Sequence, residues 1–182
     1  IQVVERNDTR YLLLNEGQGL HSVYHPEHLD TGGTWDYYLT AAFFNAPPIA
    51  PDQVENVAII GLAAGTISRQ YSEVFGEIPI TGIEIDGDII AAGRRFFGMR
   101  QPNLRVIEAD GRPALASLTD KFSVIAVDAY RLPYIPWHLT TREFFRETRS
   151  HLREQGALAI SVGRTPTDRR LVEALSTTLL TV

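Results

Sequence analysis

Cysteine is absent from the 182 residues, which excludes disulfide bonds and metal sites that depend on thiolates. There is no run of basic residues either, and the formal net charge is −5. Binding to a nucleic-acid backbone requires clustered lysine and arginine, so no nucleic-acid partner is expected. No stretch reaches the ~20 consecutive apolar residues of a membrane-spanning helix. His21, His25, His28 and His151 share no ligand spacing, and no metal site is predicted.

What the sequence does contain suits one globular unit with a real core. Hydrophobic residues make up 44% of it and charged residues 21%, with 14 glycines and 10 prolines. The first residue is Ile1 rather than methionine, and strand-like sequence begins at once. We therefore expect the sequence to be a fragment of a longer chain.

Residues 57–66 carry the strongest local signal. An uncharged apolar run ends there in Gly61-x-x-x-Gly65, which is typical of a buried strand that turns sharply into a helix. Glycine allows the tight turn and the close approach of a ligand to the backbone. The free N–H groups at the start of the helix would then face that ligand. Taken alone, this stretch leaves an ordinary buried strand ending in glycine as the alternative.

Carboxylates follow the next three apolar runs. Glu84 lies roughly 20 residues after Gly61, where nucleotide-binding folds place an acid that accepts hydrogen bonds from ribose hydroxyls. Asp110 and Asp128 follow the other two runs. Each acid alone could be a helix N-cap or a solvated loop residue. Three at corresponding strand ends favour a ligand site, because open α/β sheets bind ligands beyond the carboxyl ends of their strands.

The first part of the chain predicts a small antiparallel sheet. Strand-like stretches alternate with turn signals, the strands being residues 2–5, 10–14 and 20–24. A helix with aromatic faces is predicted for residues 35–44, and we assign its aromatic side chains to the core rather than to a ligand platform. Positions 47, 48 and 51 are proline, which forbids helix and central strand. A domain boundary is therefore placed between residues 1–50 and 51–182.

From residue 54 onward, strand-like and helix-like segments alternate. The predicted strands are 57–60, 79–85, 104–108, 122–127 and 157–162, and the predicted helices are 64–75, 87–97, 112–118, 141–153 and 166–179. Residues 140–143 have the spacing of a capping box, Gly156 is suited to end that helix, and Pro166 to begin the last one. Repeated βα units predict an α/β fold with a Rossmann-like parallel sheet. We expect the sheet to continue beyond Val182 and so to be truncated at its C-terminal edge.

These motifs, in this order, resemble those of spermidine synthases. The matching stretches are Leu13-Leu14-Asn15-Glu16-Gly17-Gln18, Gly61-x-x-x-Gly65, Glu84-Ile85-Asp86, Glu108-Ala109-Asp110-Gly111-Arg112 and Val127-Asp128. The resemblance covers nearly the whole chain and implies an aminopropyltransferase with the class I methyltransferase fold. It is closest to spermidine-synthase-like domains that some bacterial proteins carry behind multi-pass membrane segments. The resemblance therefore implies a cytoplasmic location, either as a separate protein or as the cytoplasmic domain of a membrane protein.

The resemblance also implies a ligand, namely decarboxylated S-adenosylmethionine or S-adenosylmethionine as co-substrate, with no metal. Residues implied around this nucleoside are Gln18, Gly61, Gly65, Glu84, Asp86, Asp110 and Gly111. Among them, Glu84 would hold the ribose and Asp110 the adenine amino group. The family's N-terminal sheet often pairs between subunits, so a homodimer is compatible with the resemblance.

Asp128 stands where the family keeps the carboxylate that receives the attacking amine. An ammonium group must lose a proton before it attacks the carbon beside sulfur, and a nearby carboxylate can hold and deprotonate it. Proximity and in-line geometry would supply much of the remaining rate. Tyr37, Tyr130 and Arg131 are assigned to the amine side of the site and its gate. His138 could act as a base there, although a lone loop histidine is more often incidental.

Two positions depart from the family pattern. Ala64 occupies the place of the aspartate that binds the charged tail of decarboxylated S-adenosylmethionine, and Arg131 the place of a second carboxylate that clamps the diamine. Arginine stays charged and repels a polyamine. Arg131 could instead pair with an acidic substrate, with the carboxylate of intact S-adenosylmethionine, or with Asp128 or another acid in a locked loop.

Three functions follow from this pattern. The first is a spermidine-synthase-like transferase whose altered clamp makes true spermidine synthesis doubtful. The second is a methyltransferase that uses S-adenosylmethionine on an unknown acceptor. The third is a non-catalytic domain for nucleotide sensing or assembly.

Overall fold

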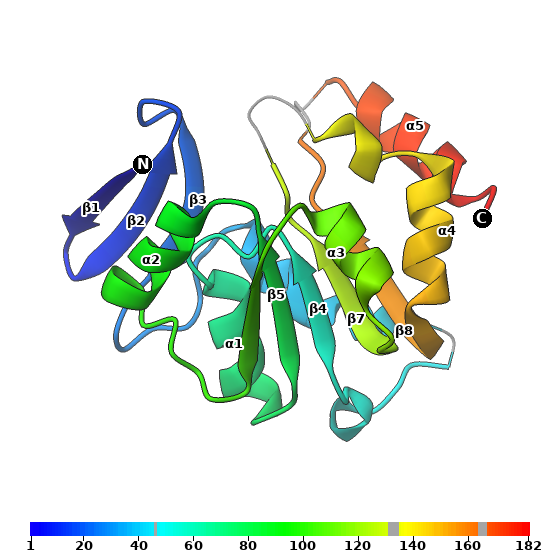
Figure 1. Ribbon diagram of the computed structural model, residues 1–182, viewed down its shortest axis with the longest axis horizontal. Coiled ribbons are helices and arrows are strands. Elements are labelled where there is room, and N and C mark those ends of the chain that lie inside the picture. Colours follow the sequence, from blue (N-terminus) through cyan, green and yellow to red (C-terminus); the bar gives the residue numbers. More distant parts are fainter. Residues whose placement is uncertain (46, 131–134, 164–166) are drawn as a thin grey trace.

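The computed structural model describes residues 1–45, 47–130, 135–163 and 167–182, which form two sheets and the helices around them (Figure 1). The smaller sheet is antiparallel, in the order β1 (Gln2–Arg6), β2 (Thr9–Leu14) and β3 (Gly19–Tyr24). The larger sheet is parallel throughout, in the order β6 (Leu104–Glu108), β5 (Ile80–Glu84), β4 (Val57–Ile60), β7 (Phe122–Val127) and β8 (Leu152–Ile160). This confirms the predicted α/β fold with its small N-terminal sheet.

Helices cover both faces of the parallel sheet. One face carries η1 (Thr34–Phe44), α1 (Thr66–Phe75) and α2 (Gly87–Phe96), and the other carries α3 (Gly111–Ser117), α4 (Arg142–Ser150) and α5 (Arg170–Leu179). Two short 3₁₀ turns, η2 (Pro51–Gln53) and η3 (Trp137–Leu139), lie in the connections. Because β4 is covered on both faces, all of its residues are buried, which explains its uninterrupted apolar sequence. No helix among the described residues is long and apolar enough to cross a membrane.

The predicted aromatic helix at residues 35–44 is a 3₁₀ helix, η1, rather than an α-helix. A 3₁₀ helix has three residues per turn, so residues three apart share a face. Trp35, Tyr38 and Ala41 have this spacing, and all three are buried against the parallel sheet. The predicted boundary at residue 50 stays a prediction, although η1 shares its core with β4 and β7.

The prediction that Gly156 ends a helix is wrong. Helix α4 stops at Ser150, and Gly156 lies within strand β8, whose pairing with β7 is interrupted by a bulge. A Cβ at Gly156 would lie 2.7 Å from the carbonyl oxygen of Phe122, so the glycine permits this close approach of the two strands. At the other end of α4, the N-cap is Thr141, whose Oγ1 accepts from the N–H of Phe144 at 3.2 Å.

The last helix also begins later than predicted. Helix α5 starts at Arg170 and not at residue 166, and Pro166 itself lies outside the described residues. Asp168 lies two residues before Arg170, and its carboxylate accepts from the N–H of Arg170 at 3.1 Å. The helix therefore begins next to this side-chain acceptor and not at the proline predicted from the sequence.

The N-terminal sheet is attached to the start of α1 by side chains of β3. Ser22 accepts from the N–H of Ala64 at 2.9 Å, and Thr66 Oγ1 bonds both backbone groups of Val23 at 3.0 Å. Leu12 from the centre of the sheet is fully buried in a cluster with Ala64 and two residues near α2. The small sheet is therefore fixed to the glycine turn that the sequence identified.

Candidate functional site

Asp128 lies at the switch point of the parallel sheet, where the strand order reverses between β4 and β7. Its backbone N–H donates to the carbonyl of Ile60, the last residue of β4, at 2.8 Å. Gly61 comes next, and a Cβ there would lie 2.5 Å from the backbone nitrogen of Ala129. The absence of a side chain at Gly61 therefore lets the two strand ends meet and fixes the backbone of Asp128.

Side chains of η1 hold the carboxylate of Asp128. Trp35 Nε1 donates to Asp128 Oδ2 at 2.9 Å, and the hydroxyl oxygen of Tyr38 lies 3.2 Å from Oδ1. Ser161, one residue beyond β8, also hydrogen-bonds this carboxylate. Because the three partners come from two separate parts of the chain, the carboxylate has a fixed orientation.

The hydroxyl of Tyr38 has one hydrogen and two acceptors within reach, Val127 and Asp128. Ser161 also hydrogen-bonds the oxygen of this hydroxyl. The shorter contact, at 2.8 Å, is to the carbonyl oxygen of Val127, which can only accept. When the hydrogen goes there, the contact to Asp128 is best satisfied by a protonated carboxyl group that donates to the Tyr38 oxygen. The geometry thus accommodates both protonation states of Asp128.

Burial raises the pKa of Asp128 to about 6, although the hydrogen bonds from Trp35, Tyr38 and Ser161 act in the opposite direction. An ordinary aspartate with a pKa near 4 is a weak base at neutral pH. General-base catalysis is most efficient when the pKa of the base is close to the working pH. The environment of Asp128 therefore suits a group that takes up a proton near neutrality.

A second carboxylate fixes the start of η1. Asp36 accepts from the backbone N–H groups of Thr31 and Gly32, from the hydroxyl of Thr31, and from Gln70 of α1. Burial alone would raise the pKa of Asp36, but these hydrogen bonds outweigh it and hold the pKa below its ordinary value. Asp36 therefore stays ionised and anchors the segment that presents Trp35.

Glu84 ends β5 and is almost fully buried beside the glycine turn. Its two carboxylate oxygens accept from the backbone N–H groups of Ala63 at 2.9 Å and Asp86 at 3.1 Å. Burial raises its pKa in spite of these bonds. Each oxygen has a further lone pair, so hydroxyl donors could still bind at its exposed edge.

Asp86 and Asp110 are the N-caps of α2 and α3, which was the alternative that the sequence left open for single acids. Asp86 accepts from the N–H groups of Asp88 and Ile89. Asp110 accepts from the N–H of Arg112 at 3.0 Å, and its second oxygen lies 3.3 Å from Nε2 of His138. Capping occupies only one oxygen of Asp110, so this role does not compete with a ligand.

The other two predicted glycines are also required for packing. Gly65 has φ +90°, and a Cβ there would lie 2.7 Å from the side chain of Met99. A Cβ at Gly111 would lie 2.4 Å from Ile60 Cγ2. Gly65 lets the start of α1 pack closely on Met99, and Gly111 lets the start of α3 pack closely on β4.

Some predicted site residues are not brought to Asp128. Gln18 is exposed in the turn between β2 and β3, and Tyr37 is 75% exposed in a shallow hollow along β8. Tyr130 is partly buried, and its hydroxyl lies against Gly163. Arg131 lies outside the described residues. Among the described residues, no group of three or more potential ligands could hold a metal ion.

Trp35, Tyr38 and Ser161 contact Asp128 but were not among the predicted site residues, and His138 was expected to be incidental. The assignment of the η1 aromatics to the core is correct for Trp35 and Tyr38 but wrong for Tyr37 and Phe44, which are exposed. The polar tips of Trp35 and Tyr38 also reach Asp128. Their i, i+3 spacing was the available signal, because it places both on one face of a 3₁₀ helix.

Trp35→Phe is expected to raise the pKa of Asp128 by about one unit or more. The substitution keeps an aromatic ring in the core but removes a donor to the carboxylate, and such a bond contributes about 1.5–3 kcal/mol, with one pKa unit worth about 1.4 kcal/mol. Carbon-13 NMR titration of the carboxyl group measures the shift. Trp137→Phe is the matched control, because Trp137 is 76% exposed. Equal titration curves in both variants would contradict the role of Trp35.

Comparisons with known proteins identify the family of this chain. The model of the spermine/spermidine synthase domain matches residues 41–180. A protein of Bifidobacterium longum described as a probable polyamine aminopropyl transferase is 33% identical over the full length of this chain. The chain spans 40% of the length of that relative.

Solved structures share the fold over most or all of this chain. A probable spermidine synthase from Corynebacterium glutamicum superposes with a TM-score of 0.83 at 19% identity, covering 100% of this chain and 66% of that one. A spermidine synthase in complex with the transition-state analogue AdoDATO gives 0.69 at 19% identity, covering 100% and 64%. Human methyltransferase-like protein 13 in complex with SAH gives 0.66 at 20% identity, covering 81% and 72%. The match of the family model over residues 41–180 places this chain in the spermine/spermidine synthase family, and the solved structures share its fold.

Proposed function

We propose that this chain binds an S-adenosylmethionine-type nucleoside and transfers a group from its sulfonium centre to an amine, with Asp128 as the base. The observation that carries the proposal is the carboxylate of Asp128, held by Trp35 and Tyr38 at the sheet's switch point with its pKa raised to about 6. Open α/β sheets bind their ligands at this point. The family match and the nucleoside-type ligands named for two structural neighbours support the same assignment.

In the proposed reaction, an ammonium group gives one proton to Asp128. The resulting amine attacks the carbon beside sulfur, a new C–N bond forms, and the C–S bond breaks so that a neutral thioether nucleoside leaves. The carboxylate thus turns a cation into a nucleophile and stays close to the remaining positive charge. A buried base near the reacting atoms also supplies the orientation that such a displacement needs.

The ligand test is calorimetry with S-adenosylmethionine, its decarboxylated form and methylthioadenosine. At least one should bind, and Glu84→Gln should weaken binding by about 10-fold to 100-fold, because a hydrogen bond to a charged group contributes about 1.5–3 kcal/mol. Glu77→Gln, an exposed position beyond α1, is the control. If none of the three ligands binds, the nucleoside site is refuted.

The second candidate function is methyl transfer from intact S-adenosylmethionine. Ala64 favours methyl transfer, because its methyl side chain takes the place of the family's aspartate that binds the amine tail of decarboxylated S-adenosylmethionine. Ala64 is fully buried, and its N–H is bonded to Ser22. A preference for S-adenosylmethionine over its decarboxylated form would support this function. Binding without turnover on any amine of a panel would support a sensing or assembly role.

We expect little or no aminopropyl transfer to putrescine. Arg131 takes the place of the clamp carboxylate in the sequence, and two unit charges at ~4 Å repel by about 4 kcal/mol at an effective dielectric near 20. Even half of this repulsion energy would weaken the binding of putrescine more than about tenfold. Arg131→Asp should therefore raise turnover, measured as methylthioadenosine release. Arg146→Asp on the exposed face of α4 makes the same charge change and should not. Brisk wild-type turnover with putrescine would show that Arg131 does not face the amine.

A further inference from the structure

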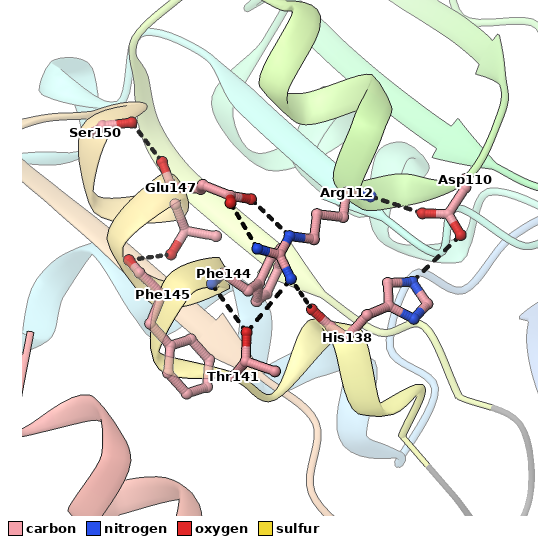
Figure 2. Close-up of polar contacts among 9 residues, drawn as sticks. Asp110, Arg112, His138, Thr141, Phe144, Phe145, Glu147 and Ser150 are labelled. Atoms are coloured by element: carbon pink, nitrogen blue, oxygen red, sulfur yellow. Dashed lines mark hydrogen bonds and ion pairs between the residues drawn. The ribbon is translucent and has the colours of Figure 1, made fainter.

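Arg112 joins three elements beside the nucleoside end of the site (Figure 2). Its guanidinium makes a two-pronged contact with Glu147 of α4, at 2.8 Å from Nε and 2.6 Å from Nη2. Nη1 donates to the backbone carbonyl of His138 at 3.1 Å. The side-chain hydrogen bond to Glu147 raises the pKa of Arg112 further above its already high value. The planar fork of arginine fits a carboxylate in this way, whereas lysine offers a single point charge.

This contact determines where His138 lies. The short turn η3 is held at its backbone by Arg112, and the imidazole Nε2 of His138 then lies 3.3 Å from Oδ2 of Asp110. The other carboxylate oxygen of Asp110 accepts from the backbone N–H of Arg112 at 3.0 Å. With one fixed partner on each oxygen, the plane of the Asp110 carboxylate is set.

The carboxylate of Asp110 can still receive a ligand. The side chain of Asp110 is 38% exposed and that of His138 is 29% exposed. Each carboxylate oxygen has two acceptor positions, so a further N–H donor can bind beside the imidazole. The fixed plane determines the direction from which that donor must come.

We propose that His138, held by the Arg112–Glu147 pair, is a positioning residue that orients Asp110 toward the amino group of a purine base. This inference rests on the proposed nucleoside-binding function. A 6-amino group donates to the oriented carboxylate, whereas a 6-oxo group presents an acceptor and is repelled. Sites built around a hydrogen bond reject an analogue that cannot make it far more strongly than apolar sites do. Discrimination between amino- and oxo-purines should therefore depend on His138.

The test is the ratio of dissociation constants for methylthioinosine and methylthioadenosine, measured by calorimetry. His138→Phe keeps a ring beside Trp137 and leaves the backbone carbonyl for Arg112, but it removes the contact with Asp110. We expect the ratio to fall about tenfold, the equivalent of about 1.4 kcal/mol, through weaker binding of the amino form alone. His138→Gln restores a donor and should recover part of the ratio.

Arg112→Lys tests whether the contact between Arg112 and Glu147 holds His138 in place. It keeps the positive charge but cannot form the fork, so it should lower the ratio as His138→Phe does. Arg146→Lys on α4, the helix that carries Glu147, is the control, because Arg146 is exposed. Thermal unfolding of each variant shows whether it is folded, and Arg112→Lys serves as the test if His138→Phe is not.

Two results would overturn the inference. An unchanged ratio in His138→Phe, with normal wild-type binding, would refute the role of His138 and leave the proposed function intact. Failure of the wild-type chain to bind either nucleoside would refute the proposed function, and the inference would fall with it.

Discussion

Asp128→Asn is expected to lower the rate of group transfer by about 10²-fold to 10⁴-fold, the usual contribution of a positioned general base. The amide has nearly the shape of the carboxylate, so the nucleoside should still bind, but an amide cannot take the proton from an ammonium group. Release of the thioether nucleoside, measured with the best amine of a panel, gives the rate. Asp120→Asn, at an exposed position before the start of the same strand, is the control. Full activity in Asp128→Asn would exclude Asp128 as the base.

Asp128→Asn should also change how the free energy of unfolding depends on pH, and the direction of this change can be derived. The pKa of Asp128 is about 6 in the folded chain against an ordinary value of 3.8, so the folded state binds the proton more tightly between these values. The contribution of Asp128 to the free energy of unfolding therefore falls by roughly 3 kcal/mol as the pH rises from about 4 to about 6, and stays level above. Asp128→Asn lacks this contribution.

The sign can be checked by urea unfolding of the wild type and Asp128→Asn at pH 4 and pH 7.5. Other titrating groups, such as Glu84, are common to both proteins and cancel in the difference. The variant should gain stability relative to the wild type at the higher pH. A difference that does not change with pH would show that the carboxylate of Asp128 is not desolvated in solution.

Gly61→Ala is expected to be the most destabilising single-methyl addition at this site. The backbone at Gly61 has φ +85°, which costs an L-residue about 1–2 kcal/mol. The new Cβ would also lie 2.5 Å and 2.6 Å from backbone atoms of Ala129. Backbone cannot rotate away as a side chain can, so overpacking adds about 1–3 kcal/mol. The sum is a large share of the ~5–15 kcal/mol by which a domain is stable.

Gly32→Ala separates the two causes. Gly32 has φ +63°, and a Cβ there would meet nothing within 4 Å. The control therefore carries the backbone strain without the clash, and should cost only about 1–2 kcal/mol in urea unfolding. Equal losses in the two variants would show that the ends of β4 and β7 can separate without cost.

The parallel sheet could be predicted because its central strands β4, β5 and β7 are buried on both faces. Such strands appear in a sequence as uninterrupted apolar runs, and β4 and β7 were placed with their correct ends. Asp128 could be placed for the same reason, since it follows β7 directly. Gly61 was identified as a site residue, but the structure gives it a packing role that a local pattern cannot show.

The hydrogen bonds around Asp128 could not be predicted in this way. Trp35 and Asp128 are 93 residues apart, and their contact depends on how η1 packs across the sheet. The contact of His138 with Asp110 likewise depends on Arg112 and on Glu147 of another helix. Local sequence patterns carry no information on which distant polar groups meet.

The error at Gly156 has a different cause. Glycine is common both after helices and at bulges where a neighbouring backbone comes close, so the residue alone does not distinguish them. Only the approach of the Phe122 carbonyl shows that β8 needs the glycine.

The hydrogen bond between Trp35 and Asp128 also makes the site visible by fluorescence. The sequence contains two tryptophans, of which Trp35 is 7% exposed and Trp137 is 76% exposed. Removing Trp137 would leave emission from one indole, whose N–H is bonded to the proposed base. Protonation of Asp128 or the arrival of a charged ligand would change the electric field at that indole. The protein thus contains its own optical reporter, in direct contact with the group whose ionisation state matters most.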